Sequence, residues 1–264
     1  MGILNVTPDS FSDGGQFLTP RKAVAHALRM EEEGSDILDV GGESTRPGAR
    51  PVSVEEELGR ILPVVEKLSK RLHIPISVDT SKPAVAEAAI KAGACLINDV
   101  TALRNPRMRE VAAFLGVPVI LMHMRGTPLS MQRNPSYRRL IPEILGELRR
   151  SIAQALESGI SRKKILIDPG LGFGKNVQDN LRILKNLSAF KALGFPVVVG
   201  PSRKSFIGRA LVQADGEVPA PKERVWATAA AVALSIAACA DIVRVHDVKE
   251  MRQVERLTTA VTQS

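Results

Sequence analysis

Eight short apolar runs, each followed by a segment that can form a helix, limit the fold of this chain more than any other feature. The runs end at Gly, Pro or polar residues and are too short for helices, so we interpret them as strands. They cover 3–4, 37–38, 76–78, 96–97, 119–122, 165–167, 197–199 and 242–245. Helical periodicity is found between them, for example at 21–33, 54–71, 83–92, 137–158, 178–190, 223–238 and 248–262.

The way the runs are connected predicts a closed parallel sheet. No two runs are joined by the short turn that an antiparallel hairpin needs, and glycines stand where the helices between them should end, at Gly34, Gly93, Gly116, Gly159 and Gly194. Eight strand–helix units predict an α/β protein, a single (β/α)8 TIM barrel. An open doubly wound sheet is the alternative. No segment has the composition of an interdomain linker, so we expect 1–264 to form one domain.

The composition is that of an ordinary globular protein, with 44% hydrophobic and 24% charged residues, which excludes a disordered or collagen-like chain. Cys95 and Cys239 lie in apolar stretches and are too few for a disulfide framework, which favours a reducing, cytoplasmic location. The first residues lack the features of an export signal. The longest uncharged stretch, 226–240, is too short to span a bilayer, and we expect a buried helix there.

The net charge of +8 makes nucleic acid a partner to consider, but the distribution of residues argues against it. The chain has one Trp, one Tyr and seven Phe, so few aromatic side chains are available to stack on bases. The basic residues are scattered along the chain in pairs. A small anionic substrate that enters a positively charged cleft explains the charge equally well, and solvated helix faces account for most of it.

Polar side chains stand at or just after the end of almost every expected strand. Active sites of (β/α)8 barrels lie at this end, and strands covered on both faces are otherwise apolar. Buried carboxylates and amides need hydrogen-bonding partners, which a polar ligand in the barrel mouth would supply. Asp39, Asp99 and His123 can equally well bond to backbone or neighbouring loops. The full set is Asn5, Asp39, Asp79, Asn98, Asp99, His123, Asp168, Arg203, Lys204, Arg244 and His246.

The residue types predict which ligand this mouth binds. The carboxylates and amide of Asp79, Asn98 and Asp168 suit a neutral heterocycle with adjacent N–H donors and carbonyl acceptors. Arg244 and His246 suit an anion such as phosphate. The sequence therefore predicts a site for a heterocycle that carries phosphate.

A metal ion fits the same prediction. Asn5 is followed by an acidic and hydroxylated segment at 9–13, and oxygen ligands of this kind suit Mg²⁺ bridging to phosphate. No Cys and His residues have the spacing of a zinc site.

Two other tempting motifs fail. The segment 170–175 reads GLGFGK, but Pro169 and Asn176 occupy positions where a phosphate-binding P-loop needs Gly and Ser or Thr, and Lys175 stands where a dinucleotide-binding fingerprint needs Gly. Ser202 and Ser205 have no acid–base partner at the spacing of a known motif, so we do not expect a serine nucleophile.

Seven strings along the chain, in order, resemble those of the dihydropteroate synthase family. The resemblance runs from residue 2 to about residue 250 and is most specific in the first, second and sixth strings. The strings are GILNVTPDSFSDGG at 2–15, DVGGESTRPG at 39–48, SVDT at 77–80, INDV at 97–100, DPGLGFGK at 168–175, SRKS at 202–205 and RVHD at 244–247.

The resemblance implies a reaction in folate synthesis. It would join 6-hydroxymethyl-7,8-dihydropterin diphosphate to p-aminobenzoate, release diphosphate and give 7,8-dihydropteroate. Asp79, Asn98 and Asp168 match the pterin-binding positions, and Lys204 matches a lysine that contacts the pterin and borders the second substrate site. Arg244 and His246 match the pair that binds diphosphate.

The resemblance also implies how the reaction is assisted. Asn5 matches an asparagine associated with Mg²⁺, and charge that develops on the departing diphosphate would be stabilised by Mg²⁺, Arg244 and His246. Asp79 would support a cationic pterin as the bond breaks. Asp79, Lys204 and Arg244 are therefore the candidate catalytic residues, in an SN1-like or a concerted transfer.

The second substrate is expected to bind under two loops, 7–15 and 44–48, that resemble the mobile loops of the family. The pattern around these loops is typical of sulfonamide-binding members, so we expect sulfonamides to inhibit the protein. The residues expected to border the p-aminobenzoate pocket are Phe11, Thr45, Arg46, Pro47, Phe173 and Ser205.

Two other functions remain as alternatives. A pterin-binding barrel that transfers a methyl group from a tetrahydrofolate to a corrinoid partner would share the fold and the pterin carboxylates, but it would not need the strings at 44–48 and 202–205. A non-catalytic pterin-binding barrel is the other alternative, and the presence of every site position argues against it. We expect a homodimer, with 226–240 and the last helix as its contact, and no membrane partner.

Overall fold

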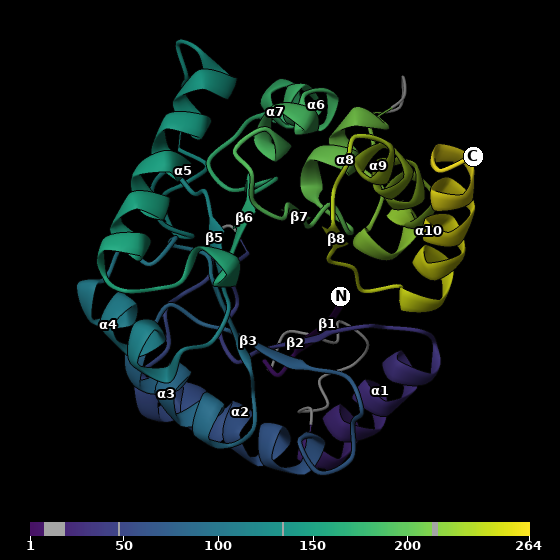
Figure 1. Ribbon diagram of the computed structural model, residues 1–264. Helices are drawn as coiled ribbons and strands as arrows, with labels where there is room; N and C mark the ends of the chain where they lie inside the picture. Colours follow the sequence, from purple (N-terminus) through teal and green to yellow (C-terminus); the bar gives the residue numbers. More distant parts are fainter. Residues whose placement is uncertain (8–18, 47, 134, 213–215) are drawn as a thin grey trace.

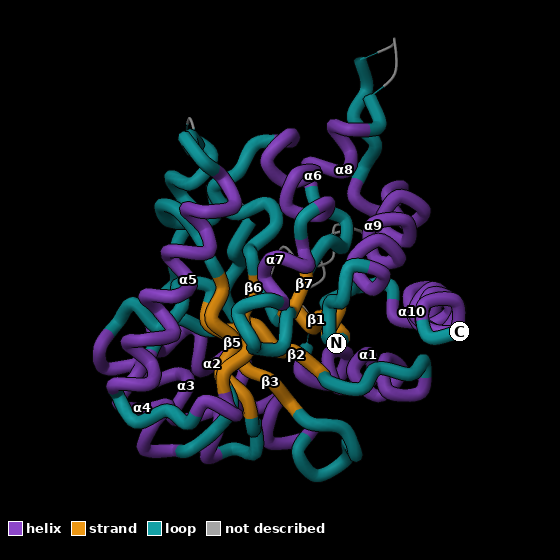
Figure 2. Tube along the Cα trace, turned by 45° about the horizontal axis from the view of Figure 1, so that its top comes forward, coloured by secondary structure: helices purple, strands orange, loops and turns teal. Residues whose placement is uncertain are grey.

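The structure, a computed structural model, describes residues 1–7, 19–46, 48–133, 135–212 and 216–264. Figure 1 shows a ring of helices around a central set of parallel strands, and Figure 2 shows the strands enclosed by helices from a second direction. Within the described residues the strands are β1 (Gly2–Asn5), β2 (Leu38–Gly41), β3 (Ile76–Asp79), β4 (Leu96–Asp99), β5 (Val119–Met122), β6 (Ile165–Asp168), β7 (Val198–Val199) and β8 (Ile242–Val243).

The helices follow the strands in the alternating order that the sequence predicts. Most of them bury an apolar face against the outer surface of the strands. They are α1 (Pro20–Glu32), α2 (Val54–Leu68), α3 (Pro83–Lys91), α4 (Pro106–Leu115), α5 (Leu140–Glu157), α6 (Val177–Lys185), α7 (Leu187–Lys191), α8 (Ser205–Ala210), α9 (Val225–Ala237) and α10 (Val248–Thr262), with 3-10 turns at Arg162–Lys164 and Pro221–Arg224.

Hydrogen bonds between neighbouring strands close the sheet into a barrel. β1 to β6 pair in parallel in chain order, and β7 pairs with β8. Two single bridges join these parts, one between Ile167 and Val197 and one between Gly2 and Val245. The second is flanked by the amide of Ile3, which donates to the carbonyl of Val245 over 2.9 Å. The predicted α/β class and (β/α)8 barrel are confirmed, and the open-sheet alternative is wrong.

The barrel interior is divided into an apolar lower layer and a polar upper layer. Alternate residues of each strand point inward. The lower cluster consists of buried Met1, Leu96, Ile120 and Val198, with Ile37, Leu166 and Ile242 packed against it. Two residues further along β4 and β6, the inward positions are Asn98 and Asp168. On β3, Asp79 pairs with Asn98, and the buried Ser77 two residues before it pairs with Leu96 of the lower layer. The polar groups therefore meet at the carboxyl ends of the strands.

Helix ends agree with the sequence at most positions, since all five predicted end glycines have the positive φ angles, from 62° to 113°, that glycine tolerates best. Two details differ. The predicted helix at 178–190 is two helices, because α6 ends at Lys185 and α7 begins at Leu187, with Asn186 between them. The short helix α8, which begins at Ser205 directly after Lys204, has too few residues to show a periodic pattern.

The expectation of a buried helix at 226–240 is wrong. α9 buries Thr228 and Val232, but the side chains of Trp226 and Leu234 are 81% and 60% exposed. The neighbouring α10 also exposes Leu257. The absence of charged residues predicts a helix buried on all sides by other elements, whereas α9 exposes one apolar face at the surface of the protein.

Both cysteines, which lie in apolar stretches of the sequence, are free and exposed. Among the residues that the structure describes, no helix is long and apolar enough to cross a membrane.

Candidate active site

A cavity at the carboxyl end of the barrel brings seven of the predicted site residues together. It spans about 340 Å³, part of it open to solvent. The predicted residues that line it are Thr45, Asp79, Asn98, Asp168, Phe173, Lys204 and Arg244, and its other walls are Val100, Met122, Gly170, Leu171 and Gly200. All three candidate catalytic residues are in this set.

Arg244 joins carboxylates from two strands at the floor of the cavity. Its Nη2 donates to Oδ2 of Asp79 over 2.6 Å, and its Nε donates to Oδ2 of Asp39 over 2.5 Å. The amide of Asn98 donates to the same Asp39 oxygen over 3.0 Å. Asp39 is fully buried, and its Oδ1 has no hydrogen-bond partner among the described residues. The side chain of Asp39 therefore bonds to two other predicted site residues, as the common acceptor that positions Arg244 and Asn98.

Burial sets the charge properties of this cluster. It raises the pKa of Asp79 to about 7, against the opposing effect of Arg244. It also raises the pKa of Asp168, whose Oδ1 accepts the amide of Gly170 over 2.6 Å. Near neutral pH, Asp79 is therefore close to the point at which a carboxyl can either donate or accept a hydrogen bond.

Lys204 stands on the opposite side of the cavity, in the loop that leads into α8. Its Nζ lies 4.1 Å from the centre of the Phe173 ring, a cation–π contact. Burial lowers the pKa of Lys204 to about 8, so the amine still carries a proton at neutral pH. The cavity thus combines hydrogen-bond acceptors from β3, β4 and β6 with one ammonium group and one aromatic face.

The loop that carries Lys204 is held by buried contacts that sequence reasoning missed. Arg203 has a positive φ of 57°, and its guanidinium pairs with the carboxylate of Asp247. The hydroxyl of Thr228 accepts the amide of Arg203 over 3.1 Å. The backbone conformation just before Lys204 is therefore fixed from two directions.

Ser202 has no acid–base partner at motif spacing, but it contacts one from a distant part of the chain. Its Oγ lies 2.9 Å from Nδ1 of His246 and accepts the backbone amide of His246 over 3.1 Å. The two residues are far apart in sequence, so a search at motif spacing could not pair them. Ser202 is only 4% exposed, and its hydroxyl is fully used in tying two loops together, so it remains unsuited to act as a nucleophile.

His246 has its imidazole fixed by the same contact. The hydroxyl of Ser202 accepts the backbone amide of His246 and also contacts Nδ1; when its proton is directed to Nδ1, the imidazole proton stands on Nε2. Burial lowers the pKa of His246 to about 3, so the ring is neutral.

The comparisons with known proteins agree with one another over nearly the whole chain. Residues 1–246 match the model of the family described as pterin binding enzyme. The dihydropteroate synthase of Bacillus subtilis is 48% identical over 262 residues, which cover 99% of this chain and 87% of the relative. The chain belongs to the dihydropteroate synthase family.

Solved structures of the family have the same fold. The dihydropteroate synthase of Yersinia pestis, solved with a sulfonamide drug, matches with a TM-score of 0.94 at 44% identity and covers 100% of this chain and 94% of its own. The Xanthomonas albilineans enzyme, solved with 4-aminobenzoic acid, matches with a TM-score of 0.92 at 46% identity, covering 100% and 92%. The resemblance on which the sequence analysis depended is therefore confirmed.

Four site residues expected from the dihydropteroate synthase resemblance lie outside the lining that the structure describes. Arg46 and Ser205 are exposed, and His246 follows Arg244 in the loop after β8. Asn5 ends β1 beside Gly41 of β2. Phe11, Pro47 and the segment 8–15 of the first loop are outside the described residues, so their predicted places in the second pocket stay predictions.

Two of the strand-end residues with open roles are structural. Oδ1 of Asp99 accepts the amide and the hydroxyl of Thr101, and its Oδ2 accepts the amide of Leu103. The imidazole of His123 lies between Glu147 and Lys175, outside the mouth cavity. These contacts come from neighbouring loops, as the alternative for these residues predicted.

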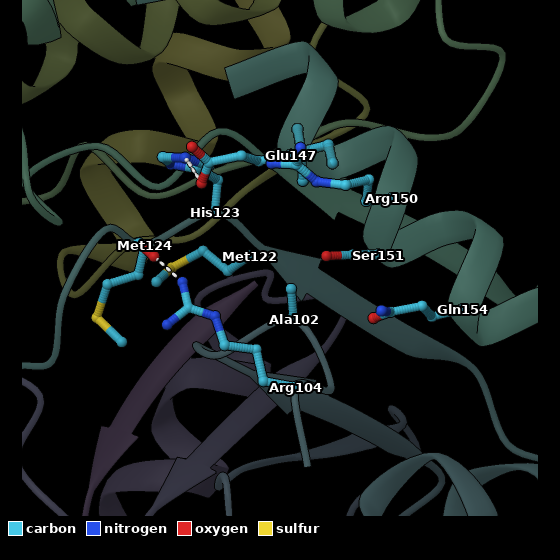
Figure 3. Close-up of a pocket in the computed structure, with 10 residues that line it drawn as sticks. Ala102, Arg104, Met122, His123, Met124, Glu147, Arg150, Ser151 and Gln154 are labelled. Carbon is cyan, nitrogen blue, oxygen red and sulfur yellow. Dashed lines mark hydrogen bonds and ion pairs between the residues drawn. The ribbon is translucent and has the colours of Figure 1, made fainter. Parts of the chain in front are cut away.

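A second cavity lies beside the first, between β5 and α5. Figure 3 shows His123 facing Glu147 in one wall, with Arg104 opposite. Met122 lines both cavities and separates them. The complete lining is Ala102, Arg104, Met122, His123, Met124, Glu147, Leu148, Arg150, Ser151 and Gln154. No residue predicted to bind a family substrate lies in it.

The described residues offer few ligands for a metal ion. No group of three His, Cys, Asp or Glu side chains among them is arranged to hold one. Asn5, the predicted Mg²⁺ ligand of this family member, supplies a single neutral oxygen. Mg²⁺ commonly takes few protein ligands and completes its shell with phosphate oxygens and water, so one amide oxygen fits an ion that arrives bound to a diphosphate.

Proposed function

We propose that this chain catalyses the reaction of its family, the transfer of the dihydropterin-methyl group from 6-hydroxymethyl-7,8-dihydropterin diphosphate to p-aminobenzoate. The observation that carries the proposal is the single cavity lined by Asp79, Asn98, Asp168, Lys204 and Phe173. These groups have the polarity that a pterin and a neighbouring arylamine require. The Xanthomonas albilineans relative, solved with 4-aminobenzoic acid, supports the choice of the second substrate.

The protein would recognise the pterin through hydrogen bonds to the polar edge of its ring. Asp168 accepts from the ring N–H groups, and the amine of Lys204 donates to a ring acceptor. One N–H of Asn98 is bonded to Asp39, which leaves its second N–H and its oxygen for the ligand. Because each group is fixed by its strand or by a second contact, the site loses little freedom when the pterin binds.

The diphosphate would leave towards Arg244 and His246. Arg244 is held in place by Asp39 and Asp79, and His246 presents Nε2–H because Ser202 occupies its other nitrogen. Both side chains can donate to an oxygen on which negative charge grows as the carbon–oxygen bond breaks. Their orientation is set before the substrate arrives, so no reorganisation is needed during the step.

The chemical step needs no nucleophile from the protein. The electron pair of the methylene carbon–oxygen bond leaves with the diphosphate, the amine lone pair of p-aminobenzoate forms the new carbon–nitrogen bond, and the amine loses a proton. We propose that the carboxylate form of Asp79, which the contact with Arg244 favours, supports the positive charge on the pterin as the first bond breaks. The protein otherwise orients the two substrates and excludes water.

We propose that Mg²⁺ assists this step. Asn5, at the end of β1, would hold it by one oxygen together with the diphosphate, and the ion would neutralise charge on the leaving group. We also propose that sulfonamides inhibit the chain, since they bind to the Yersinia pestis relative.

We further propose a cytoplasmic homodimer. The apolar side chains exposed on the adjacent helices α9 and α10, among them Trp226 and Leu257, form a face suited to a second copy. The two exposed free thiols suit a reducing compartment.

A product assay tests the proposed function. The purified chain is given the pterin diphosphate with Mg²⁺, with and without p-aminobenzoate, and both dihydropteroate and diphosphate are measured. We expect the two products in equal amounts, only when both substrates are present, and a large loss of rate when Mg²⁺ is chelated. Binding of the pterin without any product would favour the non-catalytic alternative. A rate independent of Mg²⁺ would remove the metal from the proposal.

A further inference from the structure

The loop at 170–175, between β6 and α6, folds around the side chain of its own last residue. Gly170, Gly172 and Gly174 all have φ angles between 67° and 81°, which glycine adopts most easily. A Cβ on Gly170 would lie 2.0 Å from the carbonyl oxygen of His123, and one on Gly174 would lie 2.4 Å from that of Arg125. The glycines therefore serve close packing of backbone against backbone in this loop.

Lys175 fills the space that the loop encloses. Its side chain is among the largest fully buried ones in the described structure. Nζ lies 2.8 Å from the carbonyl oxygens of both Gly170 and Phe173. It also lies 3.0 Å from Nδ1 and 3.2 Å from the carbonyl oxygen of His123. An amine with this many acceptors holds the inner face of the loop, as a bound cation would.

The orientation of Lys175 is supported from outside the loop. Burial lowers the pKa of His123 to about 4, so the imidazole is neutral and its Nδ1 can accept from Lys175. The proton on Nε2 then points to Glu147, whose Oε2 lies 3.0 Å from Nε2. Figure 3 marks this contact with a dashed line. Arg125 pairs with the same carboxylate over 2.5 Å. The acceptor groups around the amine are therefore fixed by a connected network.

The outer face of the loop has different partners. The side chain of Gln132 donates to the carbonyl of Gly172 over 2.7 Å, and the hydroxyl of Tyr137 donates to that of Gly174 over 2.9 Å. Neither reaches the carbonyl of Phe173, which accepts from Lys175. The amide of Phe173 donates to the carbonyl of Gly170 over 3.1 Å, and Lys175 binds the carbonyls of both residues. The amine therefore joins the two ends of this turn and holds Phe173 through its carbonyl.

Phe173 connects this network to the active site. Its ring is the face over which the Lys204 amine lies at 4.1 Å, and both residues line the mouth cavity. We propose that Lys175 is a positioning residue, which fixes the backbone of Phe173 and thereby preforms the half of the cavity that takes p-aminobenzoate. This inference rests on the proposed function. It gives a role to a lysine that neither a phosphate-binding loop nor the chemistry at Lys204 requires.

Steady-state kinetics of the whole chain can separate this role from general support of the fold. Lys175→Met keeps the length of the side chain but removes the donors. We expect the KM for p-aminobenzoate to rise by about tenfold or more, because the aromatic wall is no longer fixed. The KM for the pterin diphosphate should rise less, within about threefold, because Asp79 and Asn98 stand on other strands and only Asp168 is bonded to the loop, through the amide of Gly170.

Two further variants sharpen the test. Lys175→Gln retains an N–H donor, so its KM for p-aminobenzoate should lie between those of the wild type and Lys175→Met. Lys185→Met changes an exposed lysine of α6 and should behave as the wild type.

Each other outcome has a definite meaning. A folded Lys175→Met with an unchanged KM for p-aminobenzoate, or with an equal rise in both KM values, overturns the positioning role. If Lys175→Met does not fold, Lys175→Gln decides by the same comparison, and unfolding of both variants assigns Lys175 to the stability of the fold alone. A wild type that makes no dihydropteroate contradicts the proposed function instead, which keeps the two failures distinct.

Discussion

The two layers of the barrel interior are formed by the same strands, but one stabilises the fold and the other lines the mouth cavity. In β4, Leu96 lies in the lower layer and Asn98 in the upper one, and β3 and β6 likewise place carboxylates at the top. The lower layer is apolar and buried, so it contributes free energy of folding. The upper layer keeps polar groups with raised or lowered pKa values at the edge of a cavity. Residues only two positions apart on one strand therefore serve different purposes in this protein: one stabilises the fold, and the other belongs to the proposed active site.

The largest effect on activity is expected from a change to the polar groups at the mouth cavity. Lys204→Ala removes the only ammonium among the described cavity residues. We expect kcat/KM to fall by about 10²–10³-fold, since a lost donor at the reacting centre costs about this much in other enzymes. The Tm should change little, because the residue is partly exposed. A variant with nearly normal kinetics would contradict the role of Lys204.

The complementary change is made in the lower layer. Ile120→Ala removes a fully buried side chain, and we expect the free energy of unfolding to fall by about 2–5 kcal/mol, because the cavity left behind cannot collapse completely. Chemical denaturation measures this loss. At a temperature where the variant remains folded, kcat/KM should match that of the wild type, and a large fall would show that the two layers are not separable.

The pH dependence of activity sharpens the comparison further. Burial lowers the pKa of Lys204 from 10.5 to about 8, so kcat/KM should decline above pH 8 as the amine loses its proton. A pH profile of Lys204→Arg serves as the control, because a guanidinium stays protonated and should retain its residual activity to higher pH.

The same shift makes a prediction for stability, with the opposite sign. Between about pH 8 and 10.5 the unfolded chain holds a proton on Lys204 that the folded chain has released. Stability attributable to this group therefore rises with pH in that range. Denaturation of the wild type and Lys204→Met should show the wild type gaining stability relative to the variant as the pH increases, and a loss would contradict the lowered pKa.

The smallest effect on activity is expected outside the barrel. Trp226→Asp places a charge in the exposed apolar face of α9 and should shift the proposed dimer towards monomer, measured by light scattering. Because α9 does not line the mouth cavity described here, kcat/KM should stay within about twofold. A wild type that is monomeric at all concentrations would remove the dimer from the account.

The fold and the upper layer could be predicted from sequence because both follow local rules. Short apolar runs with polar final residues indicate parallel strands that end in a site, and this places Asp79, Asn98 and Asp168 correctly. Pairings between distant residues could not be predicted in the same way. Nothing local to Arg244 or Asp39 shows that their side chains meet, because closure of the barrel brings β2 and β8 together at the site.

The errors also have physical reasons. An uncharged helix was expected to be buried, whereas Trp226 shows that an apolar face can lie at the surface. The contact between Ser202 and His246 could not be predicted from a motif, because the two residues lie in loops that follow different strands. The burial of Lys175 could not be predicted, because the segment 170–175 is compared only with phosphate- and dinucleotide-binding motifs, and neither describes a lysine enclosed by its own loop.

A crystal structure of the chain with 6-hydroxymethyl-7,8-dihydropterin diphosphate tests the central claim most directly. The account predicts that the ring is bound by Asp79, Asn98 and Asp168, with Lys204 beside it and the diphosphate towards Arg244 and His246. A pterin bound in the cavity beside His123 and Glu147, or one that leaves the upper-layer carboxylates uncontacted, would contradict it.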